Sequence, residues 1–163
     1  MKGKPEALEV LGQQLKAELG AILQYIVQGE MCDNWGYIRL AKSLKAQALG
    51  EMKHAEALIE RILFLDGSPD VTTVPPLNIG SNVKEQLQYN LALELAAVAD
   101  YNKAVARVSL ATAEGAVFDD GTRKLFETIL VDEEEHVNYL EAQLQIIRDI
   151  GLENYLIEQT HEG

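Results

Sequence analysis

The chain has 163 residues, of which 47% are apolar and 25% are charged. This balance is typical of a folded domain and argues against wholesale disorder. Acidic residues outnumber basic ones by 26 to 14, which gives a formal net charge of −12. Because neutralisation of phosphates by Lys and Arg supplies most of the affinity for nucleic acids, a nucleic-acid binder is not expected.

The sequence also argues against a membrane or secreted protein. The longest segments without charge, 19–29 and 71–83, are shorter than the roughly 18 residues that span a bilayer. The N-terminal segment lacks the apolar core of a signal peptide, and the single cysteine, Cys32, cannot form an internal disulfide. We therefore expect a cytoplasmic protein.

Apolar residues recur at three- and four-residue steps through most of the chain, which is the period of the α-helix. The pattern predicts a first helix over about 5–34, beginning at Pro5, and a second over about 38–65. A segment with three of the four prolines, 66–82, then interrupts the pattern.

Helical periodicity resumes after this segment. Asn82 and Glu85 form a capping-box signature that opens the third helix. Gly115 and the cluster Asp119-Asp120-Gly121 predict a turn before the fourth, and Gly151 ends the fourth. These last helices are expected over about 83–113, 122–149 and 152–160.

The lengths of the connections predict the topology. Short connections make the first and second helices, and the third and fourth, antiparallel neighbours. The segment 66–82 can reach roughly 50 Å, about the length of a long helix, so the second and third helices are expected to be parallel. The predicted fold class is all-α: a single domain over 1–163, with a four-helix bundle over about 5–149, one long crossover and a short C-terminal helix.

Each of the four long helices carries one glutamate inside its apolar stripe. All four lie within about one turn of the midpoints of their helices, so the bundle would bring four carboxylates to one level of the core. Burial of an unpaired carboxylate costs several kcal/mol, and no Lys or Arg interrupts the stripes at this level, so these groups either are protonated or bind cations. They are Glu18, Glu51, Glu94 and Glu133.

Two histidines favour metal. His54 follows Glu51 by three residues and His136 follows Glu133 by three, so each pair shares one helix face. One Glu from each of two helices, with Glu-x-x-His from each of the other two, is the ligand pattern of ferritin-like di-iron proteins. An oxygen-rich set with two imidazoles suits iron or manganese better than a thiolate-binding metal.

Several motifs are spread over nearly the whole chain. They include Asn34-Trp35-Gly36, Glu51-Met52-Lys53-His54-Ala55, Leu77-Asn78-Ile79-Gly80, Leu91-Ala92-Leu93-Glu94-Leu95, Asp132-Glu133-Glu134-x-His136 and Gly151-Leu152-x-Asn154-Tyr155-Leu156. Together these motifs resemble those of the bacterioferritins, haem-containing members of the ferritin family, which are ferritin-like four-helix bundles. The resemblance implies an iron-storage protein that assembles from dimers into a hollow 24-subunit shell. It also implies a ferroxidase that oxidises Fe2+ to Fe3+ with O2 or H2O2 and deposits ferric mineral inside the shell.

The resemblance implies roles for individual residues of a di-iron centre. Glu51 and Glu133 would bridge the irons, and Tyr25 would be a hydrogen-bond donor or an electron source beside them. A tyrosine that only fills the core is the alternative for Tyr25. The remaining ligands would complete one iron each, as the pairs Glu18 with His54 and Glu94 with His136.

Met52 is implied as the ligand of a b-type haem. One Met52 from each of two subunits would hold the haem at the dimer interface, and a ferredoxin-type protein would be the reductant. Met52 follows Glu51 directly, so it faces about 100° away from the metal centre, towards the outside of the bundle. The alternatives are a methionine that packs in a surface groove and one that packs in a dimer interface without haem.

Other functions would use some of the same residues. A rubrerythrin-type di-iron oxidase would use similar ligands, although Cys32 alone cannot build a Cys-rich iron domain. A haem carrier without enzymatic activity would need only Met52, and a DNA-binding mini-ferritin is disfavoured by the acidic charge. The acidic turn over 112–122 either lines an iron entry pore or is a solvated loop; its acids are Glu114, Asp119 and Asp120.

Overall fold

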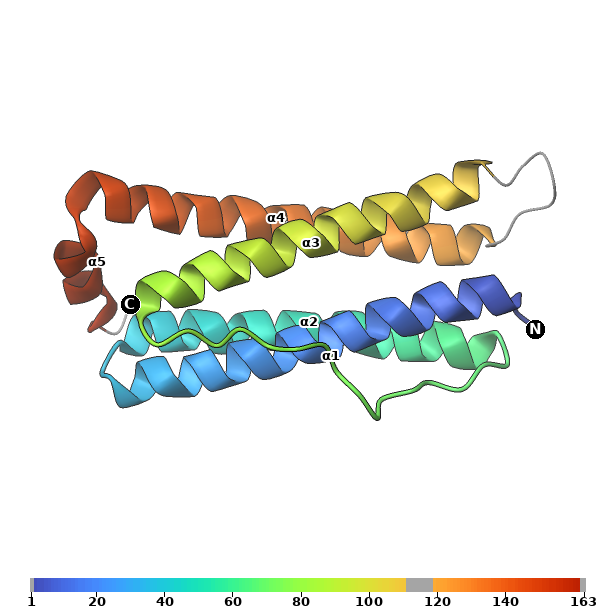
Figure 1. The fold of residues 1–163 in the computed structure, drawn as a ribbon, viewed down its shortest axis with the longest axis horizontal. Helices are drawn as coiled ribbons and strands as arrows, with labels where there is room; N and C mark the ends of the chain where they lie inside the picture. The colour runs from blue at the N-terminus through green and yellow to red at the C-terminus, as the bar shows by residue number, and fades with distance from the viewer. Residues whose placement is uncertain (1, 111–118, 162–163) are drawn as a thin grey trace.

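A computed structural model describes residues 2–110 and 119–161 of the chain, and these residues form five helices and no strands (Figure 1). The predicted fold class is confirmed: four long helices form a bundle, and a short helix follows them at the C-terminal end. The helices are α1 (Pro5–Asn34), α2 (Ile38–Phe64), α3 (Val83–Leu110), α4 (Asp120–Ile150) and α5 (Leu152–Gln159).

The helix starts follow local chemistry. Pro5 occupies the first turn of α1, as expected. The amide of Glu85 donates to Asn82 Oδ1 at 3.0 Å, as in a capping box. Glu85 Oε2 accepts in return from the amide of Ser81 at 2.8 Å, whereas in the standard motif it would accept from the amide of Asn82. The predicted capping box therefore forms, with its second bond shifted by one residue.

The start of α4 corrects the prediction. Asp119 and Asp120 were expected in a turn before a helix beginning near residue 122, but α4 begins at Asp120. The reason is that the Asp119 side chain caps the helix by accepting from the amide of Thr122 at 2.9 Å. Glu114, the other member of the predicted acidic turn, lies outside the described residues, as does the predicted end of the third helix beyond residue 110.

Asp119 also pairs with the guanidinium of Arg61 on α2. This pairing explains Gly121, because a Cβ at that position would lie 2.7 Å from Arg61 Nη2. The small residue lets the guanidinium reach the first turn of α4, so α2 and α4 are tied together at this end of the bundle.

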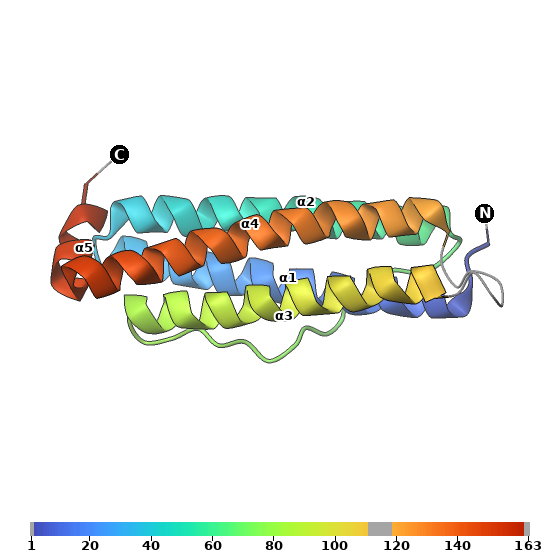
Figure 2. The same ribbon diagram turned by 90° about the horizontal axis from the view of Figure 1, so that it is seen from above.

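The long crossover runs along the bundle against α1 and α3, on the side away from α2 and α4 (Figures 1 and 2). Buried side chains of α1 hold its backbone: Gln24 Oε1 accepts from the amide of Asn78 at 3.1 Å, and Gln28 Nε2 donates to the carbonyl of Ile79 at 3.0 Å. Gln24 also donates to Asn90 Oδ1 on α3 at 2.8 Å. The crossover thus returns the chain to its starting end, and α2 and α3 are parallel.

The apolar core is divided into two clusters along the bundle. One extends along α1 from Ala7 to Leu15, and the other begins on the same helix at Ala21. On α2 the corresponding boundary falls between Ala48 and Ala55. A polar layer therefore lies between two apolar clusters, at the level of the four core glutamates.

None of the helices within the described ranges combines the length and the apolar character needed to cross a bilayer.

Replacement of Leu58 by Ala tests the packing of the first cluster. Leu58 has no exposed surface, so loss of its side chain should lower the free energy of unfolding by about 2–5 kcal/mol. Chemical denaturation of the metal-free protein measures the change. Leu63→Ala, the same change at an exposed position of α2, is the matched control, and equal effects of the two variants would contradict this packing.

Candidate metal centre

Four carboxylates meet in the polar layer, one from each long helix. Their exposed fractions are between 0 and 3%, although Glu is among the residues most often found on protein surfaces. His54 is also buried, and the side chain of His136 is 16% exposed. The four carboxylates are Glu18 on α1, Glu51 on α2, Glu94 on α3 and Glu133 on α4.

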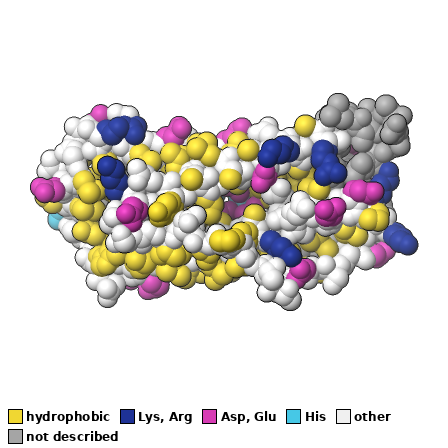
Figure 3. Space-filling view, viewed as in Figure 1, with side chains coloured by type: hydrophobic (Ala, Val, Ile, Leu, Met, Phe, Trp, Pro, Cys, Tyr) yellow, Lys and Arg dark blue, Asp and Glu magenta, His cyan; other side chains and the backbone are white. Residues whose placement is uncertain are grey.

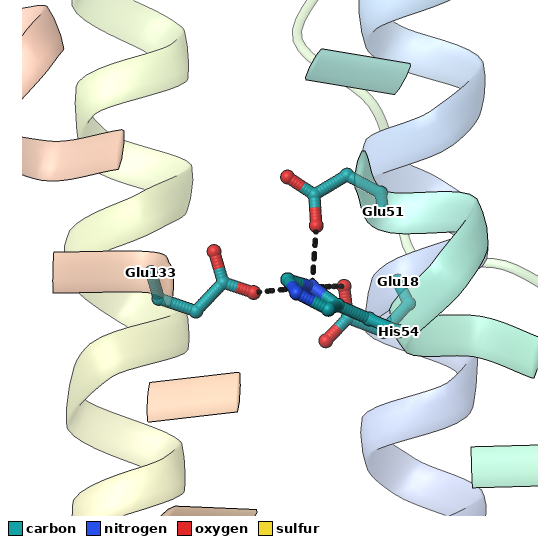
Figure 4. Close-up of side chains that lie close together, drawn as sticks. All are labelled: Glu18, Glu51, His54 and Glu133. Atoms are coloured by element: carbon teal, nitrogen blue, oxygen red, sulfur yellow. Dashed lines mark hydrogen bonds and ion pairs between the residues drawn. The ribbon is translucent and has the colours of Figure 1, made fainter. Parts of the chain in front are cut away.

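His54 lies between three of these carboxylates (Figure 4). Its Nδ1 atom is 3.0 Å from Glu51 Oε2, 3.3 Å from Glu133 Oε1 and 3.8 Å from Glu18 Oε2. One imidazole nitrogen thus faces oxygens that come from three different helices.

His136 has a matching environment. Its Nδ1 atom is 3.1 Å from Glu51 Oε1, 3.1 Å from Glu133 Oε2 and 3.8 Å from Glu94 Oε2. The two imidazole rings lie 6.2 Å apart, centre to centre. Glu51 and Glu133 therefore face both histidines, one oxygen towards each.

The structure thus brings all six predicted ligands together in two overlapping groups. Within each group, one candidate ligand atom per residue lies within 4.8 Å of all the others. Glu51 and Glu133 belong to both groups, which is the arrangement that two bridging carboxylates require. The first group adds Glu18 and His54, and the second adds Glu94 and His136.

The pKa values of the two shared carboxylates, Glu51 and Glu133, are lowered, whereas those of the other two are raised. Burial opposes ionisation of Glu133, but hydrogen bonds with His136 and His54 outweigh it and lower the pKa of Glu133 to about 2. The pKa of Glu51 is also lowered, because its contacts with His136 and His54 outweigh the effect of burial. Burial raises the pKa of Glu18 to about 7 and that of Glu94 to about 8.

The histidines respond to the same contacts. Burial disfavours the imidazolium of His136, but contacts with Glu133, Glu51 and Glu94 outweigh burial and raise its pKa to about 12. The pKa of His54 is raised as well, despite burial, by Glu133, Glu18 and Glu51. In the absence of metal, imidazolium groups thus supply the positive charge that the carboxylates require.

Two tyrosines donate hydrogen bonds to Glu18 and Glu94, the outer carboxylates, which belong to one ligand group each. Tyr25 on α1 donates to Glu94 Oε1 on α3, and Tyr101 on α3 donates to Glu18 Oε1 on α1. Burial raises the pKa of both phenols further above its usual value, so both remain protonated donors. Sequence reasoning identified Tyr25 but did not assign a role to Tyr101, although Tyr101 follows Glu94 by the same seven residues that separate Tyr25 from Glu18.

Asp132 is a second residue that sequence reasoning missed. Its Oδ2 atom lies 3.1 Å from His54 Nε2, the ring nitrogen that points away from the carboxylates. Asp132 is half exposed and begins an acidic run on α4. The sequence offered no sign that one member of this run faces a histidine of α2.

The residues fit a pair of metal cations. Glu51 Oε1 is buried and accepts no hydrogen bond, although it lies 3.1 Å from His136 Nδ1, so it has a free lone pair for a cation. Two divalent cations would balance the four carboxylates, and oxygen atoms with two imidazoles suit iron or manganese. Both the donor atoms and the charge balance therefore fit a pair of metal cations.

A hollow of about 370 Å³ connects this layer to the surface between α1 and α3. Glu18, Glu94 and Tyr101 line its inner part, whereas Pro75 and Leu77 of the crossover line its outer part. Figure 3 shows hydrophobic side chains gathered over the left and the middle of this face. The centre thus lies beside a hollow whose walls are largely apolar.

Met52 lies outside the centre. It is 49% exposed on α2, and its neighbour one turn earlier, Leu49, is 60% exposed. On the adjacent helix α1, Leu23 and Ile26 are also about 40% exposed. The thioether is therefore available to a group bound on the outer surface of α2.

Comparisons with known proteins agree with this architecture. The chain matches the family of ferritin-like domains over residues 8–150. It is 41% identical to the bacterioferritin of Mycolicibacterium paratuberculosis over 95% of this chain and 94% of that protein. It is 41% identical to the bacterioferritin of Brucella melitensis, over 95% and 92% of the two chains, and 39% identical to that of Streptomyces coelicolor, over 98% and 94%. The chain therefore belongs to the ferritin family and, within it, to the bacterioferritins.

Proposed function

We propose that the protein stores iron and that each chain is a ferroxidase, which oxidises Fe2+ to Fe3+ at the buried carboxylate–histidine centre. Membership of the bacterioferritins supports iron storage. The observation that carries the oxidation step is the pair of overlapping ligand groups that share Glu51 and Glu133. Two ferrous ions joined by common carboxylates can deliver two electrons to one oxidant molecule.

Each side chain has a role in this proposal. Glu51 and Glu133 bridge the two ferrous ions, and the other four ligands divide between them. Four carboxylates balance the charge of two Fe2+ ions. The centre with both substrate ions bound therefore has no net charge, which limits the cost of burying the ions. The first ion is completed by Glu18 and His54, and the second by Glu94 and His136.

The chemistry balances with either oxidant. With H2O2, two Fe2+ ions lose one electron each, and the peroxide takes up both electrons and two protons to give two water molecules. With O2, the same electrons and protons give H2O2. The Fe3+ product then hydrolyses and is stored as a ferric mineral.

The tyrosines hold the outer carboxylates in position. Tyr101 fixes one oxygen of Glu18 and Tyr25 fixes one oxygen of Glu94, which leaves the second oxygen of each carboxylate directed towards a histidine. Tyr25 is also close enough to supply an electron to the centre.

Storage requires a compartment for the mineral. We propose that the chains assemble from dimers into a 24-subunit shell in the cytoplasm. Since one chain has a mass of 18.0 kDa, the complete shell has a mass of about 430 kDa.

We also propose that Met52 binds a b-type haem, with one Met52 from each of two copies of the chain. The half-exposed thioether and the exposed Leu49 one turn earlier on α2 fit the edge of a flat apolar group that a second copy covers. When bound, the haem supplies one-electron transfer between an external reductant, of the ferredoxin type, and the stored iron.

The double variant Glu51→Ala, His54→Ala tests the ferroxidase. Loss of one bridging carboxylate and one imidazole should lower the initial rate of Fe2+ oxidation by at least about 100-fold, measured by stopped-flow absorbance of the ferric product. Glu134→Ala, an exposed position on α4, is the control. A double variant as fast as that control would refute a role for the centre.

Tyr101→Phe tests the positioning of Glu18. The ring keeps its packing against Phe126, with centroids 5.8 Å apart, but Glu18 Oε1 loses its donor. We expect Fe2+ oxidation to slow by about 10-fold, as for the loss of an outer-shell hydrogen bond to a metal ligand. Tyr155→Phe is the matched control, because Tyr155 is buried and bonded to Gln143, outside the polar layer; an equal effect of both variants would contradict the assignment.

Met52→Leu tests the haem site. The variant keeps an apolar side chain of similar size but removes the thioether, so reconstituted protein should lose the haem absorption band while the mass of the assembly is unchanged. Met31→Leu, which alters the half-buried methionine beside Gln86, should retain the haem. Full haem binding by Met52→Leu would contradict the proposal.

A further inference from the structure

The metal centre has an internal two-fold repeat. The interval from Glu18 to Glu94 equals the interval from Tyr25 to Tyr101, and on the other two helices the interval from Glu51 to Glu133 equals that from His54 to His136. The contacts repeat too: each histidine faces both shared carboxylates and one outer carboxylate at 3.8 Å.

One contact breaks this repeat. Asp132, the residue before Glu133, lies 3.1 Å from His54 Nε2. The matching residue before Glu51 is Gly50, which has no side chain to offer His136. Among the described residues, none forms a hydrogen bond with His136 Nε2, and the side chain of His136 is 16% exposed against 9% for His54.

The contact with Asp132 has a specific consequence for His54. When a carboxylate accepts the proton of Nε2–H, the neutral ring must present the lone pair of Nδ1, and Nδ1 is the atom that faces the carboxylates. Such outer carboxylates orient the imidazole, and their loss typically weakens metal binding by about 10–100-fold. Within residues 2–110 and 119–161, no carboxylate makes the same contact with His136 Nε2.

We propose that the two metal positions are inequivalent: the position at Glu18 and His54 holds metal tightly, and the position at Glu94 and His136 is the one through which metal exchanges. This inference depends on the proposed two-metal centre. Asp132 is a positioning residue that acts by orienting His54. At the corresponding place before Glu51, Gly50 has no side chain that could orient His136.

Space around Gly50 allows the missing contact to be added. A Cβ at this position would meet no atom within 4 Å beyond its own neighbours, so Gly50→Asp can be accommodated. Gly50→Ala provides the matched control, because it makes a similar change to the helix backbone without adding a carboxylate.

Equilibrium titration of the metal-free protein with Co2+, followed by its visible absorption, tests the inference without any turnover. We expect two binding steps per chain that differ in affinity by about 10–100-fold. His54→Ala should remove the tight step and His136→Ala the weak one. Asp132→Asn should weaken only the tight step by about 10-fold or more, Asp132→Glu should keep most of its affinity, and Glu134→Gln should change neither step.

Gly50→Asp should strengthen the weak step, whereas Gly50→Ala should leave it unchanged. Two equal steps in the unmodified protein, or an equal loss in both steps in Asp132→Asn, would overturn the inequivalence and leave the two-metal centre standing. Binding of fewer than two Co2+ ions per chain, insensitive to His54→Ala, would overturn the proposed centre itself.

Discussion

The structure depends on charge compensation in one layer of the bundle core. Four carboxylates, each from a different helix, are almost completely buried there, and without cations they would be too costly to desolvate. In the metal-free state two imidazolium groups and two phenols contact these carboxylates, and Glu51 Oε1 is left without a hydrogen bond. The apolar clusters on either side supply the packing that stabilises the helices, so the layer can be polar without loss of the fold.

The crossover determines that the tyrosine–glutamate contacts of this layer occur as a matched pair. Because the segment between α2 and α3 returns to the starting end of the bundle, α1 and α3 are antiparallel, and a tyrosine seven residues after a glutamate meets the glutamate of the opposite helix. Tyr25 and Tyr101 thus exchange partners across α1 and α3. The same segment covers the groove between these helices, and its residues Pro75 and Leu77 line the hollow beside the centre.

Much of the fold and the centre could be predicted from the sequence, because both follow from periodicity. The interrupted apolar stripes identified the four helices and the four glutamates, and the Glu-x-x-His spacing identified both histidines. Contacts between helices were harder to predict: nothing in an acidic run indicates that Asp132 faces His54, and the capping of α4 by Asp119 depends on the backbone at that helix start. The roles of Met52 and of the shell came from family resemblance, since a single chain does not contain the surface that a second copy would cover.

Diffraction from crystals soaked anaerobically in a ferrous salt, with data collected at the iron absorption edge, tests the central claim most directly. The account predicts two anomalous peaks inside each bundle, each next to one histidine and both in contact with Glu51 and Glu133. Saturating iron that leaves this layer without peaks, or with its carboxylates turned towards solvent, would contradict it.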